Sequence, residues 1–130
     1  MIRKLFYFFR LPLIVYVLGL ILSIFKVHRV FPWIDIPLHL IGGIVLAYSF
    51  VLVLEFLKTK KLIKIDNKWI YFIIVLGLVS LIAVFYEFYE FLLSYLFKLG
   101  MQGNLSDTMC DLFLGLFGGA FLFIFKKSKI

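Results

Sequence analysis

The chain has 130 residues, of which 65% are hydrophobic and 16% are charged, and its mean hydropathy is +1.13. Soluble domains are only about half apolar, so this composition excludes an ordinary soluble domain and favours a membrane protein. The net charge of +7 would suggest a nucleic-acid partner if the chain were soluble. The single cysteine, Cys110, excludes an internal disulfide framework and a cysteine-based zinc motif.

Four apolar stretches are each long enough to cross a bilayer, which takes about 20 mostly apolar residues. They predict an all-α fold, a polytopic membrane protein in which one domain, residues 1–130, forms a four-helix transmembrane bundle. The first stretch follows Arg3 and Lys4 as a signal peptide would, but no small-residue cleavage site comes after it, so we expect it to be retained. The predicted helices span about residues 5–25, 36–57, 69–97 and 108–125.

The basic residues predict how the helices are oriented. The side that carries more Lys and Arg faces the cytoplasm, so we expect both termini and the 58–68 loop to be cytoplasmic in the plasma (inner) membrane. The net charge then reflects orientation and contact with anionic membrane lipid, and no nucleic-acid motif is present. Only Lys26, Arg29 and Lys98 lie on the opposite side. The other eleven of the fourteen basic residues are Arg3, Lys4, Arg10, Lys58, Lys60, Lys61, Lys64, Lys68, Lys126, Lys127 and Lys129.

Acidic residues are costly within a membrane span, by about 2.5–3.5 kcal/mol at its centre. Two of the seven have ordinary explanations, because Asp66 is in a loop and Glu55 has Lys58 one helical turn away. The other five lie at the outer ends of the second, third and fourth helices. They are Asp35, Glu87, Glu90, Asp107 and Asp111.

The spacing of these residues places them on shared helix faces. Asp35 and His39 are four residues apart, as are Asp107 and Asp111, and Glu87 and Glu90 are three apart. At a rise of about 1.5 Å per residue, the three pairs lie at similar depths and can meet.

Small residues continue each of these polar faces toward the inner side of the membrane. Small residues at helical spacing allow backbones to approach closely in lipid, so we expect the acidic faces to be packing faces too. The first helix has a weaker stripe without an ionisable group, and we expect a structural role for it. The stripes are Gly42 and Gly43; Gly77, Ser80, Ala83 and Ser94; Gly115, Gly118 and Gly119; and, in the first helix, Pro12, Tyr16, Gly19 and Ser23.

Several carboxyl groups near a low-dielectric boundary cannot all remain charged without a shared proton, a basic partner or a bound cation. Carboxylates and a histidine from facing helices are how helical bundles hold divalent metals, and this donor set suits Mg, Mn, Fe(II) or Zn. We therefore predict a metal site of one or two ions. Its candidate ligands are Asp35, His39, Glu87, Glu90, Asp107 and Asp111.

Simpler structural roles are open for some of these residues. His39 can hydrogen-bond a neighbouring helix, and Asp107 or Asp35 can cap the helix it begins, with Ser106 as a competitor of Asp107. Cys110 points about 100° away from Asp111 around the helix and is interpreted as a small apolar filler. Glu87, Glu90 and Asp111 have no comparable alternative.

Three segments resemble the YjdF-like family of uncharacterised inner-membrane proteins. Residues 35–40, with Gly42 and Gly43, are similar to its D-x-x-x-H-F segment, and residues 86–91 to its E-x-x-E/W helix. Residues 102–111, with residues 118–120, are similar to its Q-G-D-x-x-D-T-x-x-D and G-A signature, except that Asn104 stands where the family often has Asp. The resemblance implies a shared polar site at the six candidate residues but no particular reaction.

A looser likeness links the chain to the VanZ-like family, through its D-x-x-x-H, E and D-x-x-x-N pattern. VanZ-like proteins are associated with glycopeptide resistance, so this likeness implies cell-envelope chemistry.

Three functions are compatible with these observations. The first is a metal-dependent membrane hydrolase or transferase that acts on a lipid or lipid-linked envelope substrate, with Glu87 or Glu90 as catalytic base. The second is a cation or proton transport element, which would need an oligomer because the inner halves of the helices are apolar. The third is a non-catalytic accessory protein whose acidic residues hold the bundle together.

Overall fold

The computed structural model describes residues 2–125, and this part of the chain is helical, without strands. Four of its helices are long and apolar enough to cross a membrane. The predicted all-α transmembrane bundle is therefore confirmed. In chain order the elements are α1 (Ile2–Ile24), α2 (Val27–Val30), the 3-10 turn η1 (Pro32–Ile34), α3 (Asp35–Thr59), α4 (Lys68–Phe97) and α5 (Leu105–Phe125).

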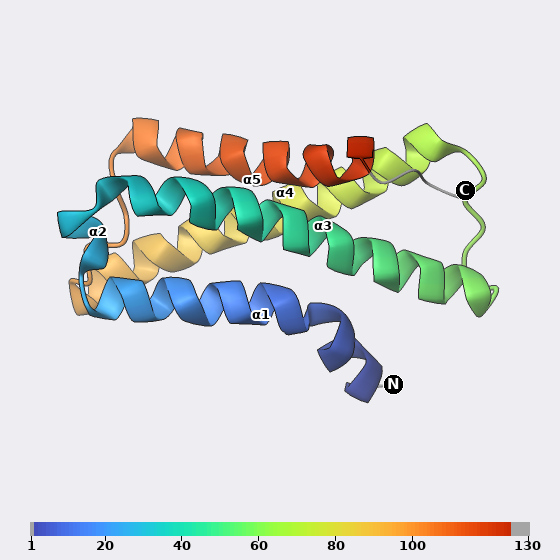
Figure 1. The fold of residues 1–130 in the computed structure, drawn as a ribbon, viewed down its shortest axis with the longest axis horizontal. Helices are drawn as coiled ribbons and strands as arrows, with labels where there is room; N and C mark the ends of the chain where they lie inside the picture. Colours follow the sequence, from blue (N-terminus) through green and yellow to red (C-terminus); the bar gives the residue numbers. More distant parts are fainter. Residues whose placement is uncertain (1, 126–130) are drawn as a thin grey trace.

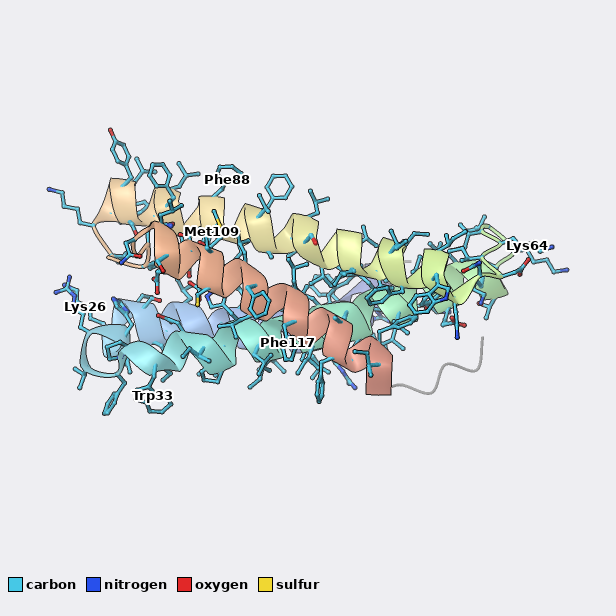
Figure 2. All side chains as sticks on the ribbon, turned by 90° about the horizontal axis from the view of Figure 1, so that it is seen from above. Lys26, Trp33, Lys64, Phe88, Met109 and Phe117 are labelled. Carbon is cyan, nitrogen blue, oxygen red and sulfur yellow. The ribbon has the colours of Figure 1, made fainter. Side chains whose placement is uncertain are left out.

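The long helices alternate in direction along the bundle (Figure 1). One end, which we call the site end, contains α2, the starts of α3 and α5 and the end of α4. The opposite end contains the start of α1 and the 60–67 loop. Lys26 and Lys64 mark the two ends in Figure 2. The cytoplasmic orientation of the lysine-rich end stays a prediction, and Lys126, Lys127 and Lys129 lie outside the described residues.

Helices α3 and α5 approach each other closely through glycines. A Cβ atom built on Gly43 would overlap the carbonyl oxygen of Gly115, and one on Gly118 would overlap that of Leu40. These glycines belong to the small-residue stripes that the sequence shows. They act as expected for helices packed in lipid, where a missing side chain allows backbone contact.

The apolar core lies beyond the glycine contact between α3 and α5, on the side away from the site end. Helices α3 and α4 supply its fully buried apolar side chains, and the Tyr71 hydroxyl donates a hydrogen bond to the Val51 carbonyl, with an O···O distance of 3.3 Å. This half of the bundle is closed by ordinary apolar packing. Its buried residues are Ala47, Val51, Leu54, Tyr71, Val75 and Val79.

Helix α1 bends in its first half, before it runs alongside α3 (Figure 1). Pro12 lies inside the helix. Proline lacks the amide hydrogen and its ring clashes with the carbonyl four residues earlier, which bends a helix at that point.

Helix α5 begins at Leu105, earlier than the predicted start near Thr108, because Asn104 caps it. The Asn104 Oδ1 atom accepts a hydrogen bond from the Asp107 amide at 3.0 Å, and the Asn104 carbonyl accepts one from the Thr108 amide at 3.1 Å. This is the geometry of an N-cap residue. The alternative in which Asp107 caps this helix is wrong.

Asp35 does not cap its helix either. Helix α3 follows directly from η1, and its start has no side-chain capping hydrogen bond. Asp35 instead occupies the first turn, where a negative charge is favourable beside the helix dipole.

Substitution of Gly43 by Ala is expected to destabilise the bundle by about 1–3 kcal/mol, because the added methyl group overlaps the backbone of α5. The neighbouring Gly42→Ala is the matched control. A Cβ on Gly42 meets nothing within 4 Å, and alanine is favoured over glycine within a helix. Thermal unfolding in detergent measures both, and equal melting temperatures would contradict the close contact.

Asn104→Ala is expected to lower the free energy of unfolding by about 0.5–2 kcal/mol, the usual effect of losing an N-cap. Asn104→Asp should retain the stability, because aspartate caps a helix equally well. Hydrogen exchange at the amides of residues 105–108 reports the change directly. Unchanged exchange in the alanine variant would show that another group caps α5.

Candidate metal centre at the site end

Three side chains from three helices converge at the site end. His39 of α3, Glu87 of α4 and Asp111 of α5 each offer a ligand atom, and these atoms lie within 4.8 Å of one another. The His39 Nε2 atom is 3.7 Å from Asp111 Oδ1. Glu87 is 8% exposed and Asp111 is 7% exposed, so both carboxyl groups are inside the bundle. The donor set is one imidazole and two carboxylates.

The glycine contact explains why these short side chains meet. Gly43 lies about one turn beyond His39 in α3, and Gly115 lies about one turn beyond Asp111 in α5. Because the two backbones touch at Gly43 and Gly115, the preceding turns are also close. His39 and Asp111 can therefore approach each other across the interface.

Glu87 is held from α5 and from the segment that precedes it. Its carboxyl group lies within hydrogen-bonding reach of Thr108 and Gln102. The Gln102 side-chain amide donates to the Thr108 hydroxyl, and the Gln102 backbone amide donates to Ser94 Oγ at 2.8 Å. The Glu87 carboxyl group therefore lies on the side of α4 that faces α5.

One oxygen of Glu87 is left without a partner. The Oε2 atom is buried and makes no hydrogen bond. An unpaired buried polar atom costs free energy, and it is costlier still if charged. Within residues 2–125, no Lys or Arg forms an ion pair with Glu87, Glu90 or Asp111. A bound cation would satisfy this oxygen.

The other three predicted ligands lie outside this group of three. Asp107 is exposed, and its carboxyl group packs against Gly103, where a Cβ atom would overlap it. Asp35 is partly exposed in the first turn of α3. Glu90 is 8% exposed and lies within hydrogen-bonding reach of the Tyr86 hydroxyl. The structure therefore brings together half of the predicted ligand set.

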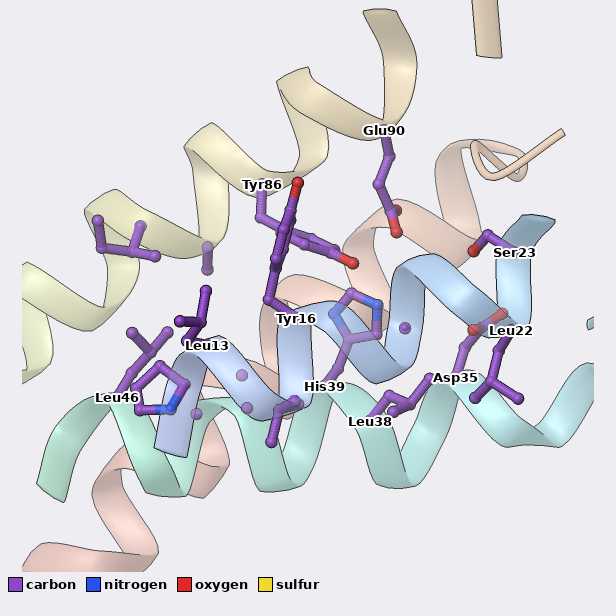
Figure 3. A pocket seen from close by; sticks show the side chains of 18 of the residues that line it. Leu13, Tyr16, Leu22, Ser23, Asp35, Leu38, His39, Leu46, Tyr86 and Glu90 are labelled. Atoms are coloured by element: carbon purple, nitrogen blue, oxygen red, sulfur yellow. The ribbon is translucent and has the colours of Figure 1, made fainter. Parts of the chain in front are cut away.

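A cavity of about 330 Å³ lies beside the three converging residues, between α1, α3 and α4. Asp35, His39 and Glu90 line it, whereas Glu87 and Asp111 do not. Figure 3 shows the Glu90 carboxyl group and the Tyr86 ring directed toward His39. The His39 and Tyr86 rings are 5.7 Å apart, edge to face. His39 thus belongs both to the group of three and to the cavity wall.

Helix α1 contributes a wall of the cavity, which the sequence pattern did not predict. Its small-residue stripe lines the cavity, and the Tyr16 hydroxyl donates to that of Tyr89 in α4 at 2.7 Å. The regular spacing of the stripe was the available signal. Its members are Pro12, Tyr16, Gly19 and Ser23.

His28 is another residue of the site end that the sequence pattern did not predict. It lines the cavity, and its Nε2 atom is buried without a hydrogen-bond partner. The turn at Lys26, with φ of 55°, directs α2 back over the cavity. The only signal in the sequence was that His28 is one of two histidines and follows the first span.

Comparison with known proteins agrees with the membrane fold. A family model described as "Predicted membrane protein (DUF2238)" matches residues 2–128. Neither a curated protein nor a solved structure matches the chain significantly. The looser likeness to the VanZ-like family stays a prediction. Because the family model covers nearly the whole sequence, the chain belongs to the DUF2238 family of predicted membrane proteins, which is the YjdF-like family.

Proposed function

We propose that this protein binds a divalent metal ion through His39, Glu87 and Asp111 and uses it to act on a lipid or lipid-linked substrate of the cell envelope. The observation that carries the proposal is the convergence of these three ligand atoms within 4.8 Å, from three different helices. The unpaired Oε2 atom of Glu87 supports it independently. The donor set suits Mg, Mn, Fe(II) or Zn.

The proposed reaction is a hydrolysis or group transfer at the outer face of the plasma membrane. A divalent ion held there would supply Lewis-acid activation of water or of a substrate oxygen. Glu90 is the better candidate for general base, since it lines the cavity and lies outside the group of three. Glu87 would serve as a ligand, positioned by Thr108 and Gln102.

The positions of Glu87 and Glu90 support this division of roles. They are three residues apart on α4 and are both buried. The Glu87 carboxyl group is directed to α5, and that of Glu90 to Tyr86 and the cavity. A general base must reach the substrate, and the cavity side of α4 offers that access.

Elemental analysis of the purified protein tests the metal site. We expect a bound divalent ion, and a rise in melting temperature when Mn²⁺ or Zn²⁺ is added to protein stripped with a chelator. Absence of bound metal together with no thermal shift for Mg²⁺, Mn²⁺, Fe²⁺ or Zn²⁺ would refute the proposal.

Asp111→Asn should weaken Mn²⁺ binding by more than about 100-fold, since loss of even an outer hydrogen-bond partner of a ligand costs about 10–100-fold. The same variant should melt higher than the wild type in the metal-free state, because it removes one of several buried like charges. This second measurement separates loss of the ligand from misfolding.

Two controls assign the roles of the remaining acidic residues. Glu90→Gln should retain Mn²⁺ binding, whereas Glu87→Gln should lose it. Asp66→Asn, in the loop at the opposite end, should resemble the wild type. Equal loss of binding in Glu87→Gln and Glu90→Gln would show that both carboxyl groups hold the ion.

A further inference from the structure

The cavity between α1, α3 and α4 has the length of one membrane leaflet. The lining residues extend from Asp35 to Leu46 on α3, from Phe9 to Ser23 on α1 and from Val79 to Glu90 on α4. At about 1.5 Å per residue, these stretches are roughly 16–21 Å long. The hydrocarbon core of a bilayer is about 30 Å thick, so one leaflet measures about 15 Å. The cavity therefore extends from the site end to about the middle of the bundle.

The wall of the cavity changes from polar to apolar along this length. Asp35 and Ser23 lie at one end in Figure 3, His39 and Glu90 lie in the middle part, and Leu13 and Leu46 lie at the other end. The long axis of the cavity is parallel to the helices, and hence to the direction in which they cross the membrane. A lipid in the adjacent leaflet has the same direction and the same polar-to-apolar order.

These features restrict the chemistry of the occupant. A small polar solute would leave the apolar half of the cavity unfilled, and a pure hydrocarbon would leave buried carboxyl groups facing apolar matter. Among the described residues, the cavity wall contains no Lys or Arg that would pair with an anionic head group. A neutral head group with hydroxyls would donate hydrogen bonds to both carboxyl groups. The volume of about 330 Å³ lies at the lower end of the range for small-molecule pockets, which suits a single chain.

We propose that this cavity binds one hydrocarbon chain of a lipid whose head group is uncharged and carries hydroxyls, with the head at Asp35 and Glu90 and the chain end near Leu13 and Leu46. The identification of this lipid as the substrate rests on the proposed function. Binding of the lipid in the cavity needs no metal. Helix α1 then forms part of the substrate site.

Photolabelling in phosphatidylcholine nanodiscs tests this inference, with a monoacylglycerol that carries a diazirine at the end of its chain. We expect saturable labelling of Leu13 and Leu46, which unlabelled monoacylglycerol competes away. The fatty acid of the same chain length should compete more weakly because its head is anionic. Labelling that does not saturate, or that is confined to residues outside the cavity wall such as Leu18, would overturn the proposal. Equal competition by the fatty acid would overturn its statement about the head group.

Two matched pairs of variants locate the binding. Val15 lines the cavity, whereas Val17 of the same helix is 43% exposed and does not. Val15→Trp should lower the saturable labelling to about a tenth or less, the change expected when added side-chain volume has to be accommodated. Val17→Trp should leave it unchanged. Equal labelling in the two variants would overturn the proposal.

The second pair tests the cavity from α3. A Cβ atom on Gly42 or on Gly77 meets nothing within 4 Å, but only Gly42 lines the cavity. Gly42→Leu should block labelling and Gly77→Leu should not. A Gly42→Leu variant that labels like the wild type would count against the proposed site.

Metal binding, measured on the same samples, separates this inference from the proposed function. Val15→Trp should bind Mn²⁺ like the wild type, and Asp111→Asn should label like the wild type. If Mn²⁺ binds but the labelling does not saturate, the lipid inference fails alone. If the labelling saturates in a wild type that binds no metal, the proposed function fails and the lipid site is supported.

Discussion

The backbone contact between Gly43 and Gly115 is the constraint on which the site depends. A side chain at Gly43 would separate α3 from α5, because even a Cβ atom there overlaps the Gly115 carbonyl. One turn away, His39 and Asp111 lie on the facing sides of the same two helices, with His39 Nε2 3.7 Å from Asp111 Oδ1. The contact therefore brings these two side chains within reach of each other. A second contact, between Gly118 and Leu40, joins the same two helices.

His39 connects two environments that differ in character. On one side its Nε2 atom faces the Asp111 carboxyl group, in a dense region where α3, α4 and α5 meet. On the other side its ring contacts Tyr86 and lines a cavity. Glu87 and Glu90 repeat this division on α4, one directed to α5 and the other to the cavity. Two carboxyl groups on one helical face thus end in different surroundings.

The sequence was sufficient to predict the fold and the convergence of three of the six candidate residues, because both follow from periodicity. Span length predicts the four helices, and the three- and four-residue spacings place His39, Glu87 and Asp111 on inward faces at one level. The exposure of Asp107 could not be predicted from periodicity. Its position depends on the cap at Asn104, which makes α5 begin earlier. Periodicity could not predict the cavity either. It arises where helices fail to touch, and no residue pattern records a gap between them, so His28 and the wall formed by α1 were missed.

The two halves of the bundle differ in what their buried groups contribute to stability. Away from the site end, apolar side chains such as Val75 and Val79 are almost completely buried, and the buried Tyr71 hydroxyl has a partner. At the site end, three carboxyl groups and an unpaired oxygen are buried beside a cavity, and each of these features opposes folding. A single helical bundle can sustain this arrangement because the same helices run through both halves. Packing of the apolar half and the glycine contact hold α3, α4 and α5 in place, so their other ends retain a geometry that those ends alone would not stabilise.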